Sequence, residues 1–118
     1  NELPRGTFSV GGQLPPVPPN VELIKGWFHE SLPPFLERHP ESFAFAHIDS
    51  DTYESTMDVL EHIGPRMKKG TVIVFDEYFG YRGWRLGEWK AWTDYCARSG
   101  VHYGYLAFTD ERAAIVVE

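Results

Sequence analysis

The sequence predicts an α/β fold, with parallel central strands in one sheet and an antiparallel hairpin at its C-terminal end. Two apolar, strand-like runs, residues 43–48 and 71–75, flank a segment whose apolar residues recur at helical spacing. Strands joined by one crossover helix lie parallel. Two more strand-like runs, residues 101–108 and 112–117, are separated by a link too short for a crossover, so we expect a hairpin there.

The length and composition of the chain indicate one acidic domain. Its 118 residues suffice for a single core and are too few for two. The formal net charge of -6 gives no basic surface for nucleic acid, and no apolar run reaches the roughly 18 residues of a membrane span. The lone Cys96 excludes an internal disulfide, and no signal-peptide pattern opens the chain. We therefore expect a cytoplasmic protein without nucleic-acid or membrane partners.

Residues 1–20 are rich in proline and glycine and predict an irregular loop, ahead of a single α/β domain at residues 21–118. Proline lacks the donor that a strand needs and restricts the residue before it. The proline run at residues 15–19 is compatible with a plain connection or with a ligand for a proline-recognising domain. Because no basic residue flanks the run, we favour the plain connection.

The next elements are a short strand and a short helix. Residues 21–25 predict the strand, and residues 31–39 predict the helix. Ser31 provides an N-cap, two prolines lie in the first turn where missing N–H groups do little harm, and Pro40 ends the helix.

Residues 43–48 predict a central strand covered on both faces, because the run is almost entirely apolar. Its polar member, His47, is either a core residue bonded to a neighbour, which we favour, or a ligand. The following helix begins at Asp51, whose carboxylate predicts an N-cap, with Glu54 placed to complete a capping box.

The second half of the chain repeats the alternation of strand and helix. Residues 71–75 predict the second central strand, and residues 79–83, with two glycines and two aromatic residues, predict a loop able to move over a site. Residues 84–99 predict a helix with packed tryptophans, which Gly100 ends in the left-handed conformation. The expected order is strand-helix three times, followed by the two hairpin strands.

Four carboxylates follow the two central strands at the points where these strands end. They are Asp49 and Asp51 after the first strand, and Asp76 and Glu77 after the second. The carboxyl ends of parallel strands share one edge of a sheet, where open α/β sheets build ligand sites. Clustered acids repel unless a cation, a proton or a basic partner lies among them. Asp51 is most simply a helix cap, which leaves three acids for a site.

Two interpretations of these three acids remain open. Asp49, Asp76 and Glu77 supply the oxygen ligands that Mg²⁺ prefers, whereas zinc is disfavoured because no Cys/His spacing accompanies them. The alternative is structural, in which the carboxylates cap helices and pair with nearby cations. Those cations would be Arg82, Arg85 and Lys90.

The pattern Asp49-x-Asp51 after a strand is also similar to the aspartyl-phosphate hydrolases, which use the first Asp as nucleophile and the second as acid. In those enzymes a threonine normally follows two residues after the second Asp, and the later acidic pair lies beyond one crossover unit. Here Tyr53 stands at the threonine position. We therefore disfavour this interpretation.

Three ordered segments carry a more specific resemblance. Residues 26–33 read Gly-Trp-Phe-His-Glu-Ser-Leu-Pro, residues 47–56 read His-Ile-Asp-Ser-Asp-Thr-Tyr-Glu-Ser-Thr, and residues 72–78 read Val-Ile-Val-Phe-Asp-Glu-Tyr. Together they resemble the macrocin O-methyltransferase family, class I enzymes that use S-adenosylmethionine and often methylate sugar hydroxyls on antibiotics. The resemblance implies a partial Rossmann-like class I methyltransferase sheet that ends in an antiparallel hairpin.

The resemblance also implies a metal site. Asp49 matches the first magnesium aspartate of the family and is the expected catalytic residue, while Asp76 and Glu77 match its consecutive acidic pair. The family often has Asp where this chain has Glu77. In such enzymes Mg²⁺ holds oxygens of a small-molecule hydroxyl acceptor, lowers the pKa of the hydroxyl and aims it at the methyl group.

For the cofactor, the resemblance implies that Gly26, Trp27 and Phe28 form the turn that touches the adenine of S-adenosylmethionine, with Asp49 beside the same cofactor. A class I enzyme also has a glycine-rich loop after its first strand and an acidic ribose-binding residue after its second. Neither has a counterpart before residue 21. We therefore expect the C-terminal part of such an enzyme, with its first two strands missing, which is inactive on its own.

The alternative function is a non-catalytic α/β module or assembly partner that lacks a complete cofactor site. Aromatic residues make up 15% of the chain, enough to form an interface as well as a core. A sheet edge left by absent strands invites self-association, so we expect a homo-oligomer.

Overall fold

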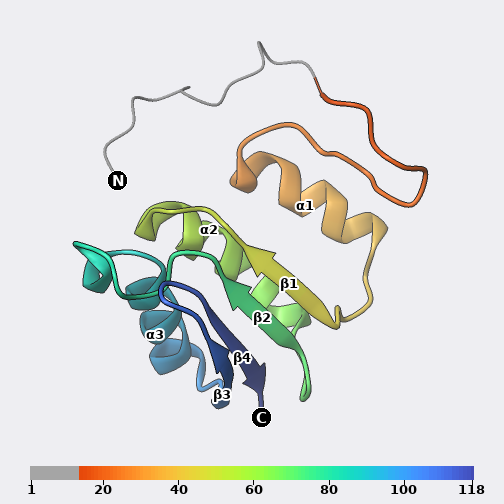
Figure 1. Cartoon of the computed structure of the whole chain (residues 1–118). Helices are drawn as coiled ribbons and strands as arrows, with labels where there is room; N and C mark the ends of the chain where they lie inside the picture. Colours follow the sequence, from red (N-terminus) through yellow and green to blue (C-terminus); the bar gives the residue numbers. More distant parts are fainter. Residues whose placement is uncertain (1–13) are drawn as a thin grey trace.

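The computed structural model describes residues 14–118, which fold around one four-stranded sheet (Figure 1). The strands are β1 (Phe45–Ile48), β2 (Val72–Phe75), β3 (Tyr103–Phe108) and β4 (Ala113–Val117), in the spatial order β1-β2-β4-β3. β1 and β2 pair in parallel, whereas β4 pairs antiparallel with both β2 and β3. The predicted α/β sheet with a parallel strand pair and a terminal hairpin is confirmed.

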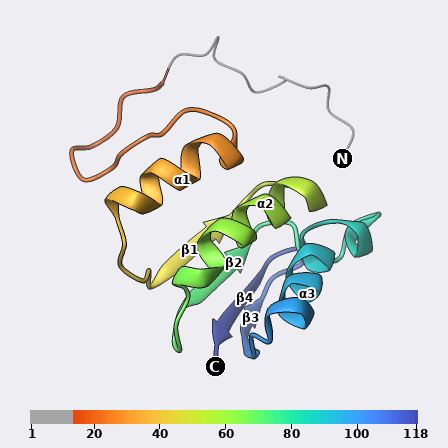
Figure 2. The same cartoon turned by 180° about the vertical axis from the view of Figure 1, so that it is seen from behind.

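Within residues 14–118, three α-helices accompany these strands. They are α1 (Phe28–Arg38), which precedes β1, α2 (Tyr53–Ile63), which connects β1 to β2, and α3 (Glu88–Ser99), which connects β2 to β3, with short 3-10 turns at Gly64–Arg66 and Trp84–Leu86. Seen from behind, α2 and α3 lie side by side against one face of the sheet (Figure 2). The first helix, α1, packs against α2, so it extends the helical layer beyond β1.

The core lies between this helical layer and the sheet. Ile73 and Phe75 of β2 and Ile115 of β4 are fully buried, because alternate residues of a strand point to the same face. Leu60 of α2 and Trp92 of α3 cover them and are also fully buried. The ring centroids of Phe75 and Trp92 lie 5.5 Å apart. The apolar side chains of the strands and of the helices therefore pack together in one core layer.

The opposite face of the sheet carries no helix within residues 14–118. Phe45 of β1 is 60% exposed there, and Val72 and Val74 of β2 are half-buried. The prediction that residues 43–48 form a central strand covered on both faces is wrong for the described chain. β1 lies at the edge of the sheet, and Phe45 and His47 are exposed on the face without helices. Parallel strands are ordinarily covered on both faces, so this exposure marks an uncovered surface.

The predicted strand at residues 21–25 is also wrong. This segment has no regular structure, and Val21, Leu23 and Ile24 are each more than a third exposed. A strand needs a neighbour to receive its backbone hydrogen bonds, and the described residues offer none at this place. The helix after it begins at Phe28 rather than Ser31, and its N-cap residue, Trp27, makes no side-chain cap.

The predicted helix at residues 84–99 divides into two parts. A 3-10 turn at Trp84–Leu86 is followed by Gly87, whose non-helical backbone (φ -111°, ψ -132°) interrupts the helix before Glu88. Gly100 ends α3 in the left-handed conformation (φ 79°), as predicted.

Residues 14–20 contain no helix or strand, and the rest of the predicted N-terminal loop, residues 1–13, lies outside the described residues. None of the helices in the described part of the chain is long and apolar enough to span a membrane.

Candidate functional site

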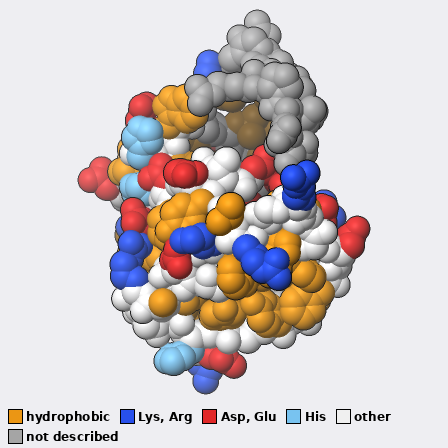
Figure 3. Space-filling view, turned by 90° about the vertical axis from the view of Figure 1, so that its left-hand side faces the viewer, with side chains coloured by type: hydrophobic (Ala, Val, Ile, Leu, Met, Phe, Trp, Pro, Cys, Tyr) orange, Lys and Arg blue, Asp and Glu red, His pale blue; other side chains and the backbone are white. Residues whose placement is uncertain are grey.

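The three predicted metal ligands lie at the carboxyl edge of the parallel strands. Asp49 directly follows β1, and Asp76 and Glu77 directly follow β2. Ile48 stands opposite Phe75 in the register, and the Asp76 N–H donates to the Ile48 carbonyl at 3.0 Å. The two strands therefore end level with each other. Figure 3 faces this side of the molecule, where acidic, basic and apolar side chains all reach the surface.

Asp76 has two basic partners. Its Oδ1 accepts a hydrogen bond from Arg112 Nε at 2.8 Å and lies 3.2 Å from His47 Nε2. The hydrogen bond from Arg112, together with the contact with His47, holds the pKa of Asp76 below its usual value despite partial burial. Because the His47 side chain is 47% exposed, the prediction that it is a core residue is wrong, although it does bond to a neighbour.

The cations expected to neutralise these acids are mostly engaged elsewhere. Arg85 lies over the ring of Trp84, 4.3 Å from its centroid, and Lys90 Nζ pairs with Asp94 at 2.6 Å. The predicted pairing of the strand-end acids with Arg85 or Lys90 is therefore wrong. Arg112, which immediately precedes β4 in the hairpin, is the cation that pairs with Asp76. Nothing in the sequence around Arg112 indicated this pairing.

Asp49 and Glu77 have the opposite electrostatic environment. Desolvation raises the pKa of Asp49, and the charges of Asp76 and Asp51 and a hydrogen bond with Asp76 raise it further. Desolvation also raises the pKa of Glu77, followed by the charges of Asp51 and Asp49. The structure thus brings the predicted acids into mutual repulsion at one edge, which a cation would relieve.

The three acids suit a hard cation such as Mg²⁺ in the type of donor atom that they offer. Their positions in this structure do not form a metal site, because no group of three His, Cys, Asp or Glu side chains within residues 14–118 is arranged to hold a metal ion. Arg112 and His47 occupy one oxygen of Asp76. A cation would have to use the other oxygen, or displace Arg112, to bind all three acids.

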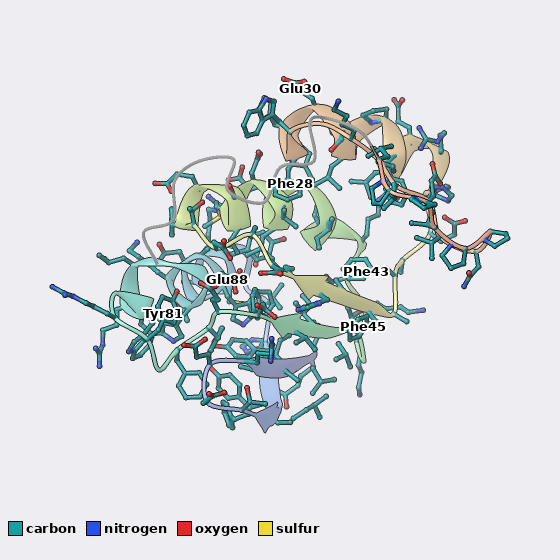
Figure 4. All side chains as sticks on the ribbon, turned by 45° about the horizontal axis from the view of Figure 1, so that its top comes forward. Phe28, Glu30, Phe43, Phe45, Tyr81 and Glu88 are labelled. Atoms are coloured by element: carbon teal, nitrogen blue, oxygen red, sulfur yellow. The ribbon has the colours of Figure 1, made fainter. Side chains whose placement is uncertain are left out.

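Glu88 is a buried carboxylate that the sequence interpretation missed. It is the first residue of α3 and is fully buried (Figure 4). Its Oε1 accepts from the Glu77 N–H at 2.9 Å, and its Oε2 accepts from the N–H groups of Ser50 and Asp51, both at 3.1 Å. Burial raises the pKa of Glu88 to about 7, although these backbone hydrogen bonds oppose the shift. The sequence signal for Glu88 is an acid in the first turn of a helix. That signal could not be used, because the helix was predicted to begin at residue 84 and not at Glu88.

Asp51 does not cap α2, contrary to the prediction. Thr52 is the N-cap, and its Oγ1 accepts from the Ser55 N–H at 3.2 Å. Asp51 instead adopts a left-handed backbone (φ 64°), which is uncommon outside glycine. The sequence therefore predicted the N-cap of α2 to within one residue, but it did not predict the left-handed turn at Asp51.

The loop after β2 is fastened at several points. The N–H groups of Tyr78 and Phe79 both donate to the Glu111 carbonyl, at 2.8 and 3.2 Å. A Cβ built on Gly80 would lie 2.2 Å from the Asp110 carbonyl oxygen, so this loop and the hairpin turn are in close contact. The Tyr81 hydroxyl donates to the Glu77 carbonyl at 3.1 Å. The predicted movable loop therefore contacts the site and rests on the hairpin.

A cavity of about 260 Å³ adjoins Glu77. It is lined by Glu77, Tyr81, Arg82 and Glu111. These side chains combine both signs of charge with an aromatic ring, a mixture suited to hydroxyl-bearing ligands.

A family model described as Macrocin-O-methyltransferase (TylF) matches residues 14–111, which is most of the chain. The chain belongs to this family. The match includes every predicted site residue.

Two curated relatives are named as O-methyltransferases, in agreement with this assignment. The chain is 38% identical over 60 residues to mycinamicin III 3''-O-methyltransferase of Micromonospora griseorubida. It is 36% identical over 58 residues to 8-demethyl-8-(2,3-dimethoxy-alpha-L-rhamnosyl)-tetracenomycin-C 4'-O-methyltransferase of Streptomyces olivaceus. Each match covers 49% of this chain, and they cover 22% and 21% of the relatives, respectively. The matched part is therefore about a fifth of the length of these relatives.

Solved structures show the same fold. The apo structure of CalS11, a TDP-rhamnose 3'-O-methyltransferase in calicheamicin biosynthesis, has a TM-score of 0.63 and 30% identity, covering 78% of this chain and 39% of that chain. The O-methyltransferase NovP has a TM-score of 0.63 and 23% identity, covering 79% of this chain and 36% of that chain, and supports the fold alone.

The residues that the family resemblance assigns to adenine lie at the start of α1, where Gly26 and Trp27 precede the helix and Phe28 is its first residue. Trp27 is 67% exposed and Phe28 is 39% exposed, and Gly26 has a φ of 137°. Phe28 lies beside α2 in Figure 4, and His29 Nδ1 lies 3.4 Å from Asp58 Oδ2 of that helix. This turn is thus anchored to the helix that follows Asp49, and its aromatic surfaces remain accessible.

Proposed function

We propose that the chain is part of an S-adenosylmethionine-dependent O-methyltransferase that methylates a hydroxyl of a sugar or another small natural product. The observation that carries the proposal is the convergence of Asp49, Asp76 and Glu77 at the carboxyl edge of the parallel strands, inside the segment that matches the family. The names of the relatives support the acceptor class, since one is an O-methyltransferase of mycinamicin III and the other is an O-methyltransferase of a rhamnosyl-tetracenomycin.

We further propose that Asp49, Asp76 and Glu77 hold a divalent cation, with Mg²⁺ preferred. Their mutual repulsion supports this, because a bound cation favours the ionised form of each acid. When bound, the ion supplies Lewis acidity that lowers the pKa of the acceptor hydroxyl. Arg112 and His47 keep Asp76 ionised and hold its Oδ1 in place. Asp49 is proposed as the catalytic residue because it directly follows β1 and interacts with the Asp76 carboxylate at the strand ends.

For the cofactor, we propose that Gly26, Trp27 and Phe28 contact the adenine ring. The exposure of the Trp27 and Phe28 rings supports a stacking role. Because the chain spans only part of the length of its relatives, we expect it to bind S-adenosylmethionine weakly and to be inactive by itself.

Paramagnetic Mn²⁺ tests the metal proposal directly. Titration of the isotope-labelled chain should broaden the amide signals of Asp49, Asp76 and Glu77 selectively at low Mn²⁺ concentration. Asp49→Asn and Asp76→Asn should each remove the effect, whereas Asp94→Asn, on α3 and paired with Lys90 and Tyr53, should not. Uniform broadening over the whole acidic surface in all these variants would contradict the proposed site.

A second candidate function is an assembly module, and the uncovered sheet surface favours it. An apolar cavity of about 430 Å³ lies between α1 and β1 and is lined in part by Phe35, Phe43 and Phe45. Unpaired strand edges beside apolar surface promote association, which also supports a homo-oligomer. Light scattering that shows a strict monomer at high concentration would count against this candidate.

A further inference from the structure

Glu88 connects the two segments that carry the proposed metal ligands. Two of its three hydrogen bonds come from the segment after β1, at Ser50 and Asp51, and the third comes from Glu77 after β2. The side chain therefore joins the ends of two parallel strands to the first residue of α3. Figure 4 shows Glu88 on the side toward which the two strands point, with Tyr81 on the same side.

The three donors to Glu88 are backbone N–H groups, not cations. Removing a carboxylate from water is unfavourable by several kcal/mol, and hydrogen bonds from the surroundings must offset that loss. The whole of this desolvation penalty applies to Glu88, because none of its surface reaches solvent. A neutral apolar side chain could fill the same space for stability alone, but it could not accept from three amides that belong to two different loops.

The backbone around Glu88 is shaped to allow this contact. The left-handed conformation of Asp51 (φ 64°) accompanies the convergence of the Ser50 and Asp51 amides on one oxygen. A Cβ built on Gly87 would lie 2.7 Å from the Tyr81 hydroxyl and 3.4 Å from the Asp51 carbonyl oxygen. Glycine at this position lets the start of α3 approach both loops closely.

Tyr81 completes the restraint on Glu77. Its hydroxyl donates to the Glu77 carbonyl at 3.1 Å, while Glu88 accepts from the Glu77 N–H at 2.9 Å. Both backbone polar groups of Glu77 are thus held by side chains. Residues that orient metal ligands without touching the metal typically change metal affinity by roughly 10–100-fold when they are replaced.

We propose that Glu88 is a positioning residue, which sets the spacing between the loops that carry Asp49 and Glu77 so that their carboxylates can share one divalent cation. This inference rests on the proposed metal-dependent function. It differs from a purely structural role, because a structural role predicts lower stability without a change in the affinity of the folded protein for the cation.

The test compares Glu88→Gln with Asp94→Asn in the 118-residue chain, using Mn²⁺ alone as the probe. Glutamine keeps one oxygen acceptor but turns an NH₂ group toward the donors of the other loop, so one connection is lost. Asp94 lies on the same helix and contacts Lys90 and the Tyr53 hydroxyl of α2, so its replacement is a matched change of acid to amide outside both loops. Calorimetry measures the Mn²⁺ Kd at a temperature where circular dichroism shows each variant folded.

We expect Glu88→Gln to raise the Mn²⁺ Kd at least about 10-fold and Asp94→Asn to leave it within about twofold. If Glu88→Gln does not fold, Tyr81→Phe replaces it in the test, because it frees the Glu77 carbonyl without disturbing the Glu88 carboxylate. We expect Tyr81→Phe to raise the Kd in the same direction by a smaller factor.

An unchanged Kd in the folded Glu88→Gln variant, or in Tyr81→Phe if that is the folded one, would overturn the positioning role. In that case loss of binding in Asp76→Asn would still uphold the proposed metal site. Absence of saturable Mn²⁺ binding in the unsubstituted chain would overturn both proposals, so the two failures are distinguishable.

Discussion

The two faces of the sheet differ in what covers them. Toward α2 and α3, Ile73, Phe75 and Ile115 are fully buried, whereas Phe45 on the opposite face is 60% exposed. Both faces carry apolar side chains, so composition does not distinguish them. The two faces support different parts of the candidate site. Glu88 and the start of α3 belong to the covered layer, whereas His47, which contacts Asp76, lies on the same face of β1 as Phe45.

The largest expected difference is between two identical substitutions on opposite faces. Phe75→Ala removes a fully buried ring and should lower the free energy of unfolding by about 3–5 kcal/mol. Phe45→Ala should change it by less than about 0.5 kcal/mol, because the ring is mostly in solvent. Urea denaturation of both variants measures the contrast. Comparable losses would mean that the exposed face is covered in solution, and concentration dependence would identify self-association.

A medium effect should follow from crowding the covered layer. A Cβ built on Gly64 would lie 1.9 Å from the Tyr95 hydroxyl of α3. Gly64→Ala should therefore destabilise the chain by roughly 1–3 kcal/mol, as overpacking usually does. Adding Tyr95→Phe removes the nearest atom and should recover part of the loss, which thermal unfolding of the single and double variants can show. Gly64→Ala with unchanged stability would indicate that α2 and α3 are loosely packed.

The smallest expected effect concerns Asp76 and Asp49 at the strand ends, whose charges should change the stability of the chain in opposite directions. The lowered pKa of Asp76 means that its charge adds stability above the unfolded pKa of about 3.9, which is lost as pH falls through the folded value. The raised pKa of Asp49 means that its contribution is present below the unfolded pKa and is lost as pH rises through the folded value.

At pH 7 without divalent cations, Asp76→Asn should therefore destabilise the chain and Asp49→Asn should stabilise it. Each change should be below about 1 kcal/mol, because these groups are partly solvated. Chemical denaturation in the presence of a chelator measures both. A change of the same sign in the two variants would contradict the electrostatic division of the site.

Local patterns predicted much of this arrangement. Continuous apolar runs indicated β1 and β2, and the short link at residues 109–111 indicated the hairpin, because loop length limits how strands can pair. The placement of Asp49 beside Asp76 followed from parallel pairing. Residues 21–25 had an equally good strand pattern, yet they form no strand, because pairing depends on a neighbour and not on composition.

The remaining features depended on contacts between distant segments. Arg112 reaches Asp76 across 36 positions in sequence, and Glu88 reaches Ser50 across 38. Neither residue lies in a motif, and each acquires its role from the packing of the hairpin or of α3 against the strand ends. Long-range contacts of single polar side chains leave no periodic trace in a sequence.

The sequence by itself determined the alternation of strands and helices, the family and the carboxylates at the strand ends, since these follow from local spacing and residue type. Only the tertiary structure decided which acid is neutralised, which remain in repulsion and which buried glutamate joins their loops. The physical reason is that burial and distance set the pKa and hydrogen-bonding partners of an acid, and both arise only when separate elements meet.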